Sequence, residues 1–309
     1  MHCCAVWTSA RRPERRGDLP LAALLLAAAV LLGAKAAAAQ EIEPNDLIPL
    51  PPGTNVALAY YEYADDTAFN YAKGSTFTAD TGMQVNLGAG RYLHYFDLAR
   101  HPAAVQVLQI FGSESDGAID GQRLGSAFGA ADIALNAAIW PYANPASGQY
   151  LVVVGWLYPP SGTYDPSSPI NLGANRWEGD VQIGWDQRIG HSFSCDIAFD
   201  TAFYGDNDNF FPGGAQLSQD PTYRLQVWAN WHWTPRLQTS LGYEGFFGGD
   251  QSLDGVFDGE KTAEQRLRFA TSYFITPSIQ ALVELNHDVQ VVGGFKQQFG
   301  TILRLAVLF

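Results

Sequence analysis

The last nine residues of the chain, Thr301–Phe309, alternate with the two-residue period of a β-strand. One face carries an almost purely apolar row, and the other carries a single charge, Arg304. An apolar row that ends on an aromatic terminal residue is typical of the closing strand of a bacterial outer-membrane barrel, where the barrel-insertion machinery reads it as a signal. A C-terminal strand of a soluble sheet would alternate in the same way, so this stretch alone leaves both interpretations open. The apolar row consists of Thr301, Leu303, Leu305, Val307 and Phe309.

The N-terminus has the parts of a secretory signal peptide. Arginines gather between residues 11 and 16, and Leu19–Gly33 is an apolar stretch. That stretch suits the apolar region of a signal peptide and is short for a membrane-spanning helix, which needs ~20 residues. Ala37-Ala38-Ala39 offers a small-residue cleavage site. We predict that residues 1–39 are a signal peptide outside the fold, with a membrane anchor as the alternative.

The predicted mature chain must hold its fold without disulfides. It keeps only Cys195, because Cys3 and Cys4 lie in the signal peptide. After residue 39 no apolar run approaches the ~20 residues of a transmembrane helix. In a membrane the mature chain would therefore have to form a closed barrel, which satisfies its backbone polar groups internally. A formal charge of −13 with no basic stripe argues against nucleic acid as a partner.

From Thr54 onward, strand-like runs alternate with breaks rich in Gly, Asp, Asn and Pro. The clearest runs carry apolar and polar rows over a length that lets a tilted strand cross a bilayer. Aromatic residues gather near the ends of these rows, for example Tyr223 and Trp233, as interfacial girdles would. Soluble sandwiches also alternate, but their strands are shorter. The predicted strands are Val56–Tyr63, Met83–Tyr92, Ala104–Gly112, Phe128–Ile139, Tyr150–Tyr158, Trp177–Arg188, Ser192–Tyr204, Thr222–Trp233, Leu237–Phe247, Gln265–Ile275, Ile279–Val291 and Thr301–Phe309.

The links between these runs alternate in length, which predicts the topology. An up-and-down barrel has long loops outside and short turns in the periplasm, and an even strand count leaves both termini in the periplasm. We therefore predict an all-β fold, a transmembrane antiparallel up-and-down β-barrel of about twelve strands over residues 54–309. The register of Val105–Phe111 stays open, because apolar residues fall on both of its faces. The long links fall near 65–80, 113–127, 159–174, 205–221 and 248–262, and the short ones near 96–102, 141–148, 188–192, 234–236 and 276–278.

Residues 40–53 form a separate proline-rich lead-in. Pro44, Pro49, Pro51 and Pro52 predict an extended, polyproline-like segment rather than a strand. Such a segment could lie in the periplasm or tuck into the mouth of the barrel.

The rows predicted to face the barrel interior hold charges of both signs. Charges that face away from lipid must pair, so these residues could form a network that plugs a narrow barrel or the polar wall of a channel. Trp228, Phe246, Phe274 and Leu282 are bulky and apolar on the same rows, and could line a path for an apolar or aromatic solute. The predicted lumen-lining residues are Glu178, Asp180, Asp186, Asp196, Asp200, Arg224, Trp228, His232, Glu244, Arg266, Arg268, Phe274, Glu284, Asp288 and Arg304.

No catalytic signature stands out in the sequence. It contains no Gly-x-Ser-x-Gly, His-Glu-x-x-His, phosphate-binding loop or cysteine pair for zinc. His287 and Asp288 face opposite ways on one strand, so they cannot pair within it. His232 could serve as a base, although a polar lumen residue is the simpler interpretation. We expect no enzyme activity, no metal and no cofactor.

The predicted long loops are acidic. Asp206-Asn207-Asp208-Asn209 resembles the start of a calcium loop but lacks the following Gly and the distal Glu. The simpler interpretation is a set of solvated, negatively charged loops. The alternative is that divalent ions bridge these loops to lipopolysaccharide of the outer leaflet.

Over residues 43–309 the chain resembles the outer-membrane proteins named for the meta pathway of phenol degradation. That resemblance implies an outer-membrane β-barrel, grouped near the fatty-acid and aromatic-hydrocarbon channels and associated with transport. It implies no catalytic or binding role for any numbered residue. The residues that carry it are Glu43-Pro44, Leu47, Pro49, Pro51 or Pro52, Gly53-Thr54-Asn55, Gly242-Tyr243 and the terminal Phe309.

We therefore expect a barrel that passes small hydrophobic or aromatic compounds passively into the periplasm, gated by its loops and by the lead-in. Its expected partners are outer-membrane lipid and lipopolysaccharide, the barrel-insertion machinery through Phe309, and the hydrophobic solute. Two alternatives stand beside this expectation. One is an outer-membrane lipid hydrolase, and the other is a structural or adhesive barrel with a closed lumen.

Overall fold

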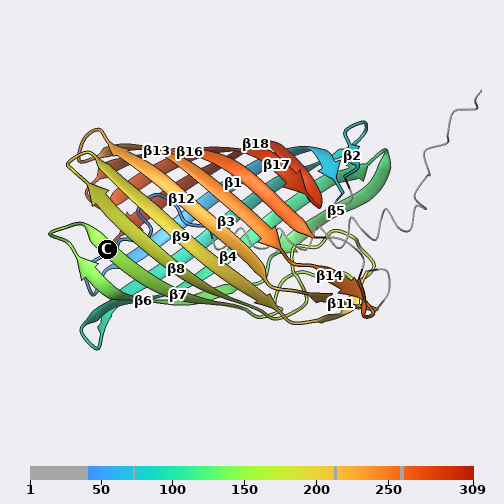
Figure 1. Cartoon of the computed structure of the whole chain (residues 1–309), viewed down its shortest axis with the longest axis horizontal. Coiled ribbons are helices and arrows are strands. Elements are labelled where there is room, and N and C mark those ends of the chain that lie inside the picture. The colour runs from blue at the N-terminus through green and yellow to red at the C-terminus, as the bar shows by residue number, and fades with distance from the viewer. Residues whose placement is uncertain (1–40, 72–73, 212–213, 258–260) are drawn as a thin grey trace, which may run out of the picture.

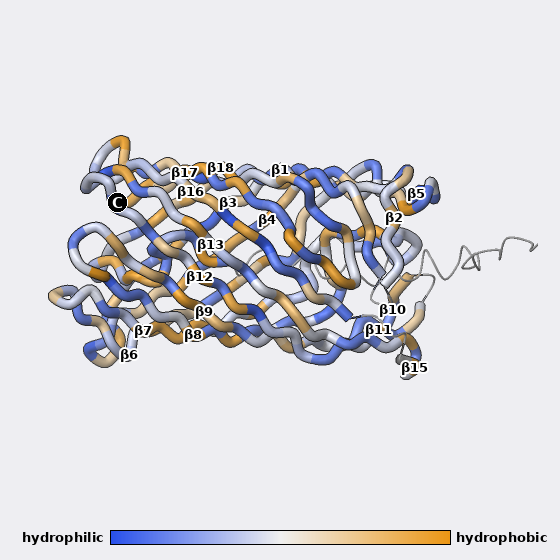
Figure 2. The backbone as a smooth tube through the Cα atoms, turned by 45° about the horizontal axis from the view of Figure 1, so that its top comes forward, coloured by the Kyte–Doolittle hydropathy of each residue, from blue (hydrophilic) through white to orange (hydrophobic). Residues whose placement is uncertain are grey.

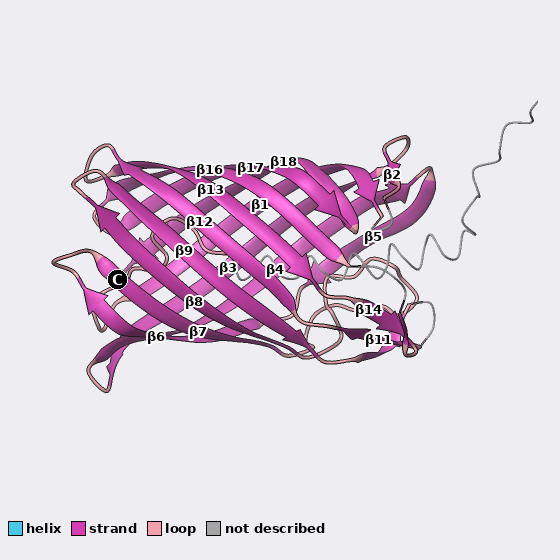
Figure 3. Cartoon of the chain, viewed as in Figure 1, coloured by secondary structure: helices cyan, strands magenta, loops and turns pink. Residues whose placement is uncertain are grey.

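The computed structural model of this chain describes residues 41–71, 74–211, 214–257 and 261–309. The predicted signal peptide, residues 1–39, lies outside the described residues. Within the described ranges, no helix has the length and apolar character that crossing a membrane requires. These residues form strands joined by loops and turns (Figure 3).

The strands close into a single antiparallel barrel (Figure 1). The main sheet has 14 strands, of which the short β2 (Thr76–Phe77) and β5 (Gln122–Ala130) lie off the wall. Closure comes from β1 (Asn55–Asn70), which pairs with β18 (Gly294–Leu308). The predicted all-β barrel of about twelve strands is confirmed. The remaining wall strands, in order, are β3 (Gly82–Leu98), β4 (His101–Ile119), β6 (Ala134–Asn144), β7 (Gln149–Tyr158), β8 (Glu178–Ile189), β9 (Phe193–Tyr204), β12 (Thr222–His232), β13 (Leu237–Gly248), β16 (Thr262–Thr276) and β17 (Ile279–Val292).

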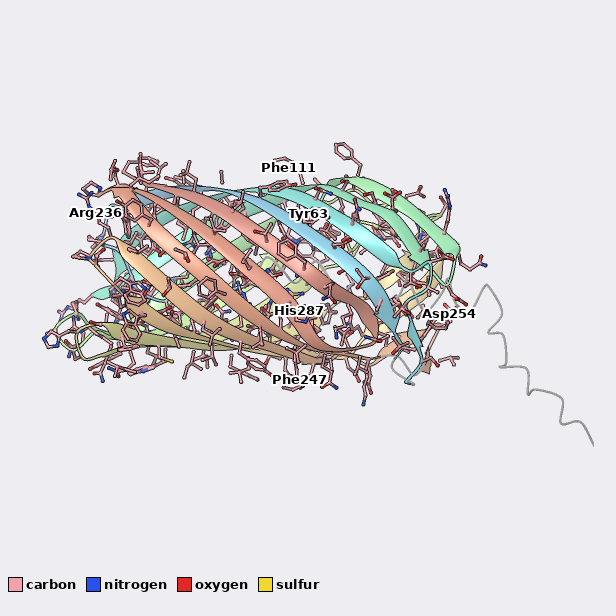
Figure 4. The ribbon with its side chains drawn as sticks, turned by 90° about the horizontal axis from the view of Figure 1, so that it is seen from above. Tyr63, Phe111, Arg236, Phe247, Asp254 and His287 are labelled. Atoms are coloured by element: carbon pink, nitrogen blue, oxygen red, sulfur yellow. The ribbon has the colours of Figure 1, made fainter. Side chains whose placement is uncertain are left out.

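The period of two gives the wall its two surfaces. In β9, Ile197 and Phe199 are 43% and 45% exposed, whereas Asp196 and Asp200 are 0% and 2% exposed. Figure 2 shows hydrophobic and hydrophilic residues mixed along each wall strand, and Figure 4 shows side chains such as Phe247 pointing away from the wall. An apolar row toward lipid and a polar row inward are what a membrane-spanning barrel requires.

The two ends of the barrel differ. The end that carries the C-terminus has tight turns, including Thr234-Pro235-Arg236, and the longer links lie at the opposite end (Figure 4 labels Arg236 at the first and Asp254 at the second). Aromatic side chains gather on the outside near the tight turns, where the Trp231 ring lies 4.2 Å from Phe193 and 5.0 Å from Trp233. Such a girdle marks a membrane interface. In an outer-membrane barrel the end with the short turns faces the periplasm.

The prediction of one continuous strand over Phe128–Ile139 is wrong. The extension β5 ends at Ala130, β6 begins at Ala134, and Ala131–Ile133 interrupt the ladder. The cause is Asp132, whose carboxylate accepts hydrogen bonds from the backbone amides of Ser161 and Gly162 at 2.7 and 2.6 Å. The link between β7 and β8 is thereby bonded to the wall at this break.

The extracellular links also differ from the simple alternation of long and short. The closing strand does not begin at Thr301, because β18 starts at Gly294 and joins β17 through a tight turn at Gly293, where φ is +69°. Glycine adopts this conformation without steric cost. Parts of the predicted loops 205–221 and 248–262 instead form a small sheet of their own, made of β10 (Asn207–Phe210), β11 (Ala215–Gln219), β14 (Gln251–Leu253) and β15 (Val256–Phe257).

Candidate functional site

The proline-rich segment from Glu41 to Gly53, here called the N-terminal segment, lies inside the barrel. Ile42 and Leu47 are 4% and 2% exposed. The indole nitrogen of Trp228 on β12 donates a hydrogen bond to the carbonyl of Ile42 at 2.9 Å, and that of Trp140 on β6 donates to Leu47 at 2.7 Å. These two tryptophans belong to different parts of the wall, so the segment crosses the lumen. The sequence predicted a position in the periplasm or in the mouth of the barrel, and the segment lies deeper than either, within the lumen.

A cluster of ions holds the first residues of this segment. Glu41 lies 3.4 Å from Arg266 and 3.3 Å from Arg268, and Glu43 lies 3.6 Å from Arg268. Arg268 is also bound by both oxygens of Glu284, at 2.7 and 3.0 Å. Bidentate pairs of this kind are strong and directional. Arg268 therefore joins the segment to β17.

A second set of polar contacts holds the middle of the segment. The backbone amide of Asn45 donates to Asp196 at 3.0 Å, and its side-chain amide donates to Gln238 at 2.8 Å. The carboxylate of Asp46 accepts from Arg304 at 3.0 Å and lies 3.6 Å from Arg91. The segment is thus bonded to strands on several sides of the lumen.

The predicted lumen-lining residues all lie on rows that alternate with the lipid-facing residues. Several of them pair across neighbouring strands: Arg224 donates to Asp200 at 3.1 Å, and Arg266 donates to Asp288 at 2.8 Å. The carboxylate of Glu244 lies 3.5 Å from Arg268. The other acids are buried as well, with Glu178 3.0 Å from Arg176, Asp180 near Asp200 and Asp186 opposite Asp196 in the register.

The structure corrects the role expected of Trp228. It was expected to line a path for an aromatic solute, but its side chain is 0% exposed. Its ring lies 4.7 Å from the guanidinium of Arg268, and its nitrogen bonds to the N-terminal segment. Trp228 therefore holds the segment in this conformation, while Phe274 does line an open cavity.

The interior wall has two unlike halves, and the apolar half was missed in the sequence. Most of the charged residues lie on β8 to β18, whereas β1, β3, β4, β6 and β7 turn mostly apolar side chains inward, with Asp66, Arg91 and Glu114 as charged exceptions. A run of buried residues at every second position of β7 was an available signal, but its outward row is apolar too, so no polar row marked the inner face. The inward residues of β7 are Tyr150, Val152, Val154, Trp156 and Tyr158.

Cavities remain between the N-terminal segment and the wall. One of them, here called the vestibule, has a volume of about 350 Å³ and lies at the periplasmic end, where Leu58, Leu93 and Phe274 line it. A smaller cavity of about 60 Å³ lies beside Glu41 and is lined by Leu87, Leu108 and Ile110 of the apolar half. Arg91 lines both cavities. Both cavities therefore border the apolar half, and the vestibule also borders polar residues of the other half, such as Gln238 and Gln280.

Loops close the opposite, extracellular end over part of its width. Ile170, from the link between β7 and β8, packs with Phe69 of β1, Ile119 of β4 and Phe295 of β18, all nearly fully buried. The same link is ordered by local hydrogen bonds. The amide and hydroxyl of Ser167 donate to Asp165 at 2.9 and 2.6 Å, which lowers the pKa of that carboxyl.

One pair of side chains bears on the hydrolase alternative. The hydroxyl of Ser194 lies 3.1 Å from Nε2 of His232, a contact between neighbouring strands that no sequence motif indicates. The same hydroxyl also interacts with the side-chain amide of Asn230 at 3.2 Å, and Ser194 is 5% exposed. No carboxylate bonds to the other ring nitrogen of His232 among the described residues. This geometry fits a polar lumen network better than a nucleophile and its base.

Comparisons with known proteins support the fold and its environment. The family described as "Putative MetA-pathway of phenol degradation" matches residues 54–304. The crystal structure of the COG4313 outer membrane channel from Pseudomonas putida F1 superposes with a TM-score of 0.83 at 28% identity, covering 87% of this chain and 100% of that one. The β domain of the Bordetella autotransporter BrkA gives a TM-score of 0.51 at 8% identity, covering 84% and 100%. A comparison with curated proteins finds no match.

Proposed function

This chain belongs to the MetA-pathway phenol-degradation family, and on that premise we propose that its barrel passes small hydrophobic or aromatic compounds passively into the periplasm. The barrel is a protein of the bacterial outer membrane, and its structural relative from Pseudomonas putida is described as a channel, not as an enzyme. What we propose is the class of solute and the direction in which it passes. Passive passage of this kind requires no cofactor.

The observation that carries this proposal is the apolar half of the lumen with the cavities beside it. A porin for sugars or ions would require polar side chains along its whole path. Here the inward residues Leu58, Leu93 and Leu108 form an apolar side of the open space, opposite its polar and charged lining. An apolar solute that follows this half would replace contacts with water by contacts with these side chains, which is favourable.

Passage requires the N-terminal segment to move, because it occupies the rest of the lumen. Its contacts are polar and numerous, so we infer a gate that is closed at rest and opens transiently. The proposal also includes recognition of the exposed terminal Phe309 by the barrel-insertion machinery, and contact of the extracellular loops with lipopolysaccharide.

Uptake by intact cells tests the proposal, because the lipopolysaccharide leaflet is the barrier that slows apolar solutes. A porin-deficient bacterial strain that makes this protein should take up radiolabelled toluene faster than the same strain without it, while glucose uptake stays unchanged. Equal toluene uptake by the two strains, or a selective gain for glucose, would refute the proposal.

The occupied lumen favours a second candidate, a structural or adhesive barrel that stays closed. The hydrogen bonds from Trp140 and Trp228 to the segment are the supporting observation. Planar bilayers separate the two candidates, since a barrel that opens should show transient conductance and a permanently closed one should show none over long recordings.

A further inference from the structure

The vestibule has the size and lining of a small-molecule site. Its volume of about 350 Å³ falls within the ~300–1,000 Å³ that such sites span. Its walls are largely apolar and come from the N-terminal segment, from seven wall strands (β1, β3, β12, β13, β16, β17 and β18) and from the turn between β12 and β13. The apolar lining includes Ile48, Val56, Leu58, Leu93, Phe274 and Leu308.

Arg304 brings an incompletely paired cation into this apolar cavity. Its side chain is 4% exposed, and its two terminal nitrogens donate to Asp46 and Gln280, each at 3.0 Å. Its Nε is buried and has no hydrogen-bond partner among the described residues. A buried donor without an acceptor costs free energy, so a native structure seldom leaves one without a reason.

A second guanidinium faces the same cavity. Arg91 lies 3.6 Å from Asp46 and donates to Gln106 at 2.5 Å. Arg91 and Arg304 thus share the carboxylate of Asp46, and Glu43 also interacts with Arg304 from outside the vestibule lining. Asp46 is the one acid among the described residues that line the vestibule, so this lining carries more positive than negative charge. An anion placed there would balance this charge, and it would reach the buried Nε of Arg304 only by displacing the groups that now cover it.

We propose that the vestibule binds a small monocarboxylate with an apolar body. The carboxylate lies against Arg304 and Arg91, and the body packs on Leu58, Leu93 and Phe274. This inference rests on the proposed function and names the class of solute that the channel selects. The bound carboxylate competes with Asp46 for both arginines, so binding loosens the N-terminal segment from the wall.

Calorimetric titration of the purified full chain in detergent tests the inference with benzoate and hexanoate as probes. Benzamide and hexanamide have nearly the same shapes without the charge. Each carboxylate should bind about tenfold tighter than its amide, which corresponds to about 1.4 kcal/mol. Tighter binding of benzoate than hexanoate would identify an aromatic body, and the reverse would identify an aliphatic one.

Variants of Asp46 and Arg304 distinguish binding at this site from a general attraction of anions to the protein. Asp46→Asn should tighten benzoate binding severalfold, because it removes the internal competitor. Arg304→Gln should abolish the preference for benzoate over benzamide, and Arg304→Lys, which keeps the charge but lacks Nε, should restore it only in part. Arg188→Gln is the matched control: Arg188 lies at the same end of the barrel, donates to the carbonyl of Ala146, and does not line the vestibule.

Equal binding of benzoate and benzamide to the unmodified protein would overturn the inference, as would unchanged or weaker benzoate binding by Asp46→Asn. A slower gel mobility after boiling verifies that each variant is folded before boiling. If Arg304→Gln does not fold, the comparison of benzoate with benzamide in the unmodified protein decides whether the inference holds. Toluene uptake by cells distinguishes failure of this inference from failure of the proposed function. Uptake without a carboxylate preference refutes only this inference, and carboxylate binding without uptake refutes only the proposed function.

Discussion

Asp46 and Arg304 are separated by 258 positions in the sequence, yet their side chains meet at 3.0 Å inside the barrel. Arg304 lies on β18, and Asp46 also contacts Arg91 on β3. These two strands flank β1 on either side. One carboxylate of the N-terminal segment therefore joins the strands on both sides of the barrel's closing seam.

Replacing Asp46 should weaken this seam. Asp46→Ala leaves Arg91 and Arg304 without their shared carboxylate, and hydrogen bonds to charged groups contribute about 1.5–3 kcal/mol each. We expect the folded band on unboiled gels to be lost at a lower temperature than in the unmodified protein. Asp97→Ala, an exposed acid near the end of β3, should leave that temperature unchanged. A melting temperature equal to that of the unmodified protein would show that the seam does not depend on the segment.

The hydrogen bond from Trp228 to Ile42 should keep the lumen closed. Trp228→Phe retains a large ring and removes the donor that bonds at 2.9 Å to the segment. A typical hydrogen bond contributes about 0.5–1.5 kcal/mol, so the open population should rise by roughly twofold to twelvefold. Planar-bilayer recordings of opening frequency measure this change. An unchanged frequency would mean that the segment does not control opening at Trp228.

A side chain at Gly242 should also open the lumen, because it would displace the Trp228 ring that bonds to the N-terminal segment. A Cβ built at Gly242 would lie 2.7 Å from the indole ring of Trp228, which is too close for a stable contact. Gly242→Val should push the ring off the segment and raise opening frequency more than Trp228→Phe does. Gly155→Ala is the control, because nothing lies within 4 Å of its added carbon. If the two glycine variants open equally often, the proximity of Gly242 to Trp228 does not affect opening of the lumen.

The sequence predicts the wall of the barrel better than its contents, for a physical reason. A lipid-facing row must be apolar at every second residue, so the runs around Asp196 and Arg268 can be recognised locally. Val105–Phe111 has no such contrast, since one face meets lipid and the other meets the apolar half of the lumen. The alternation of apolar and polar residues is then absent from the sequence, even though the strand itself is regular.

The position of the N-terminal segment inside the barrel could not be predicted from local sequence patterns, because its contacts join residues far apart in the sequence. Ile42 meets Gln226 across 184 positions, and no pattern in either stretch announces the partner. Its prolines did indicate a non-strand conformation, which is why the segment remains free to enter the lumen instead of adding to the sheet. The break at Asp132 is similar, since the amides that donate to its carboxylate belong to Ser161 and Gly162, 29 and 30 positions later.

Asp132 should control how firmly the link between β7 and β8 covers the extracellular end. Its carboxylate accepts from the amides of Ser161, Gly162 and Ala174 at 2.7, 2.6 and 2.8 Å. Asp132→Ala leaves these amides without their acceptor, so the link should separate from the wall while the barrel strands stay paired. Protease added to intact cells should then cut within residues 159–177, whereas unmodified protein should resist. Asp165→Ala is the comparison, because its bonds to Ser167 are confined to the link itself and do not reach the wall. Equal cleavage of the two variants would show that the link is held by Ile170 and its apolar neighbours, not by Asp132.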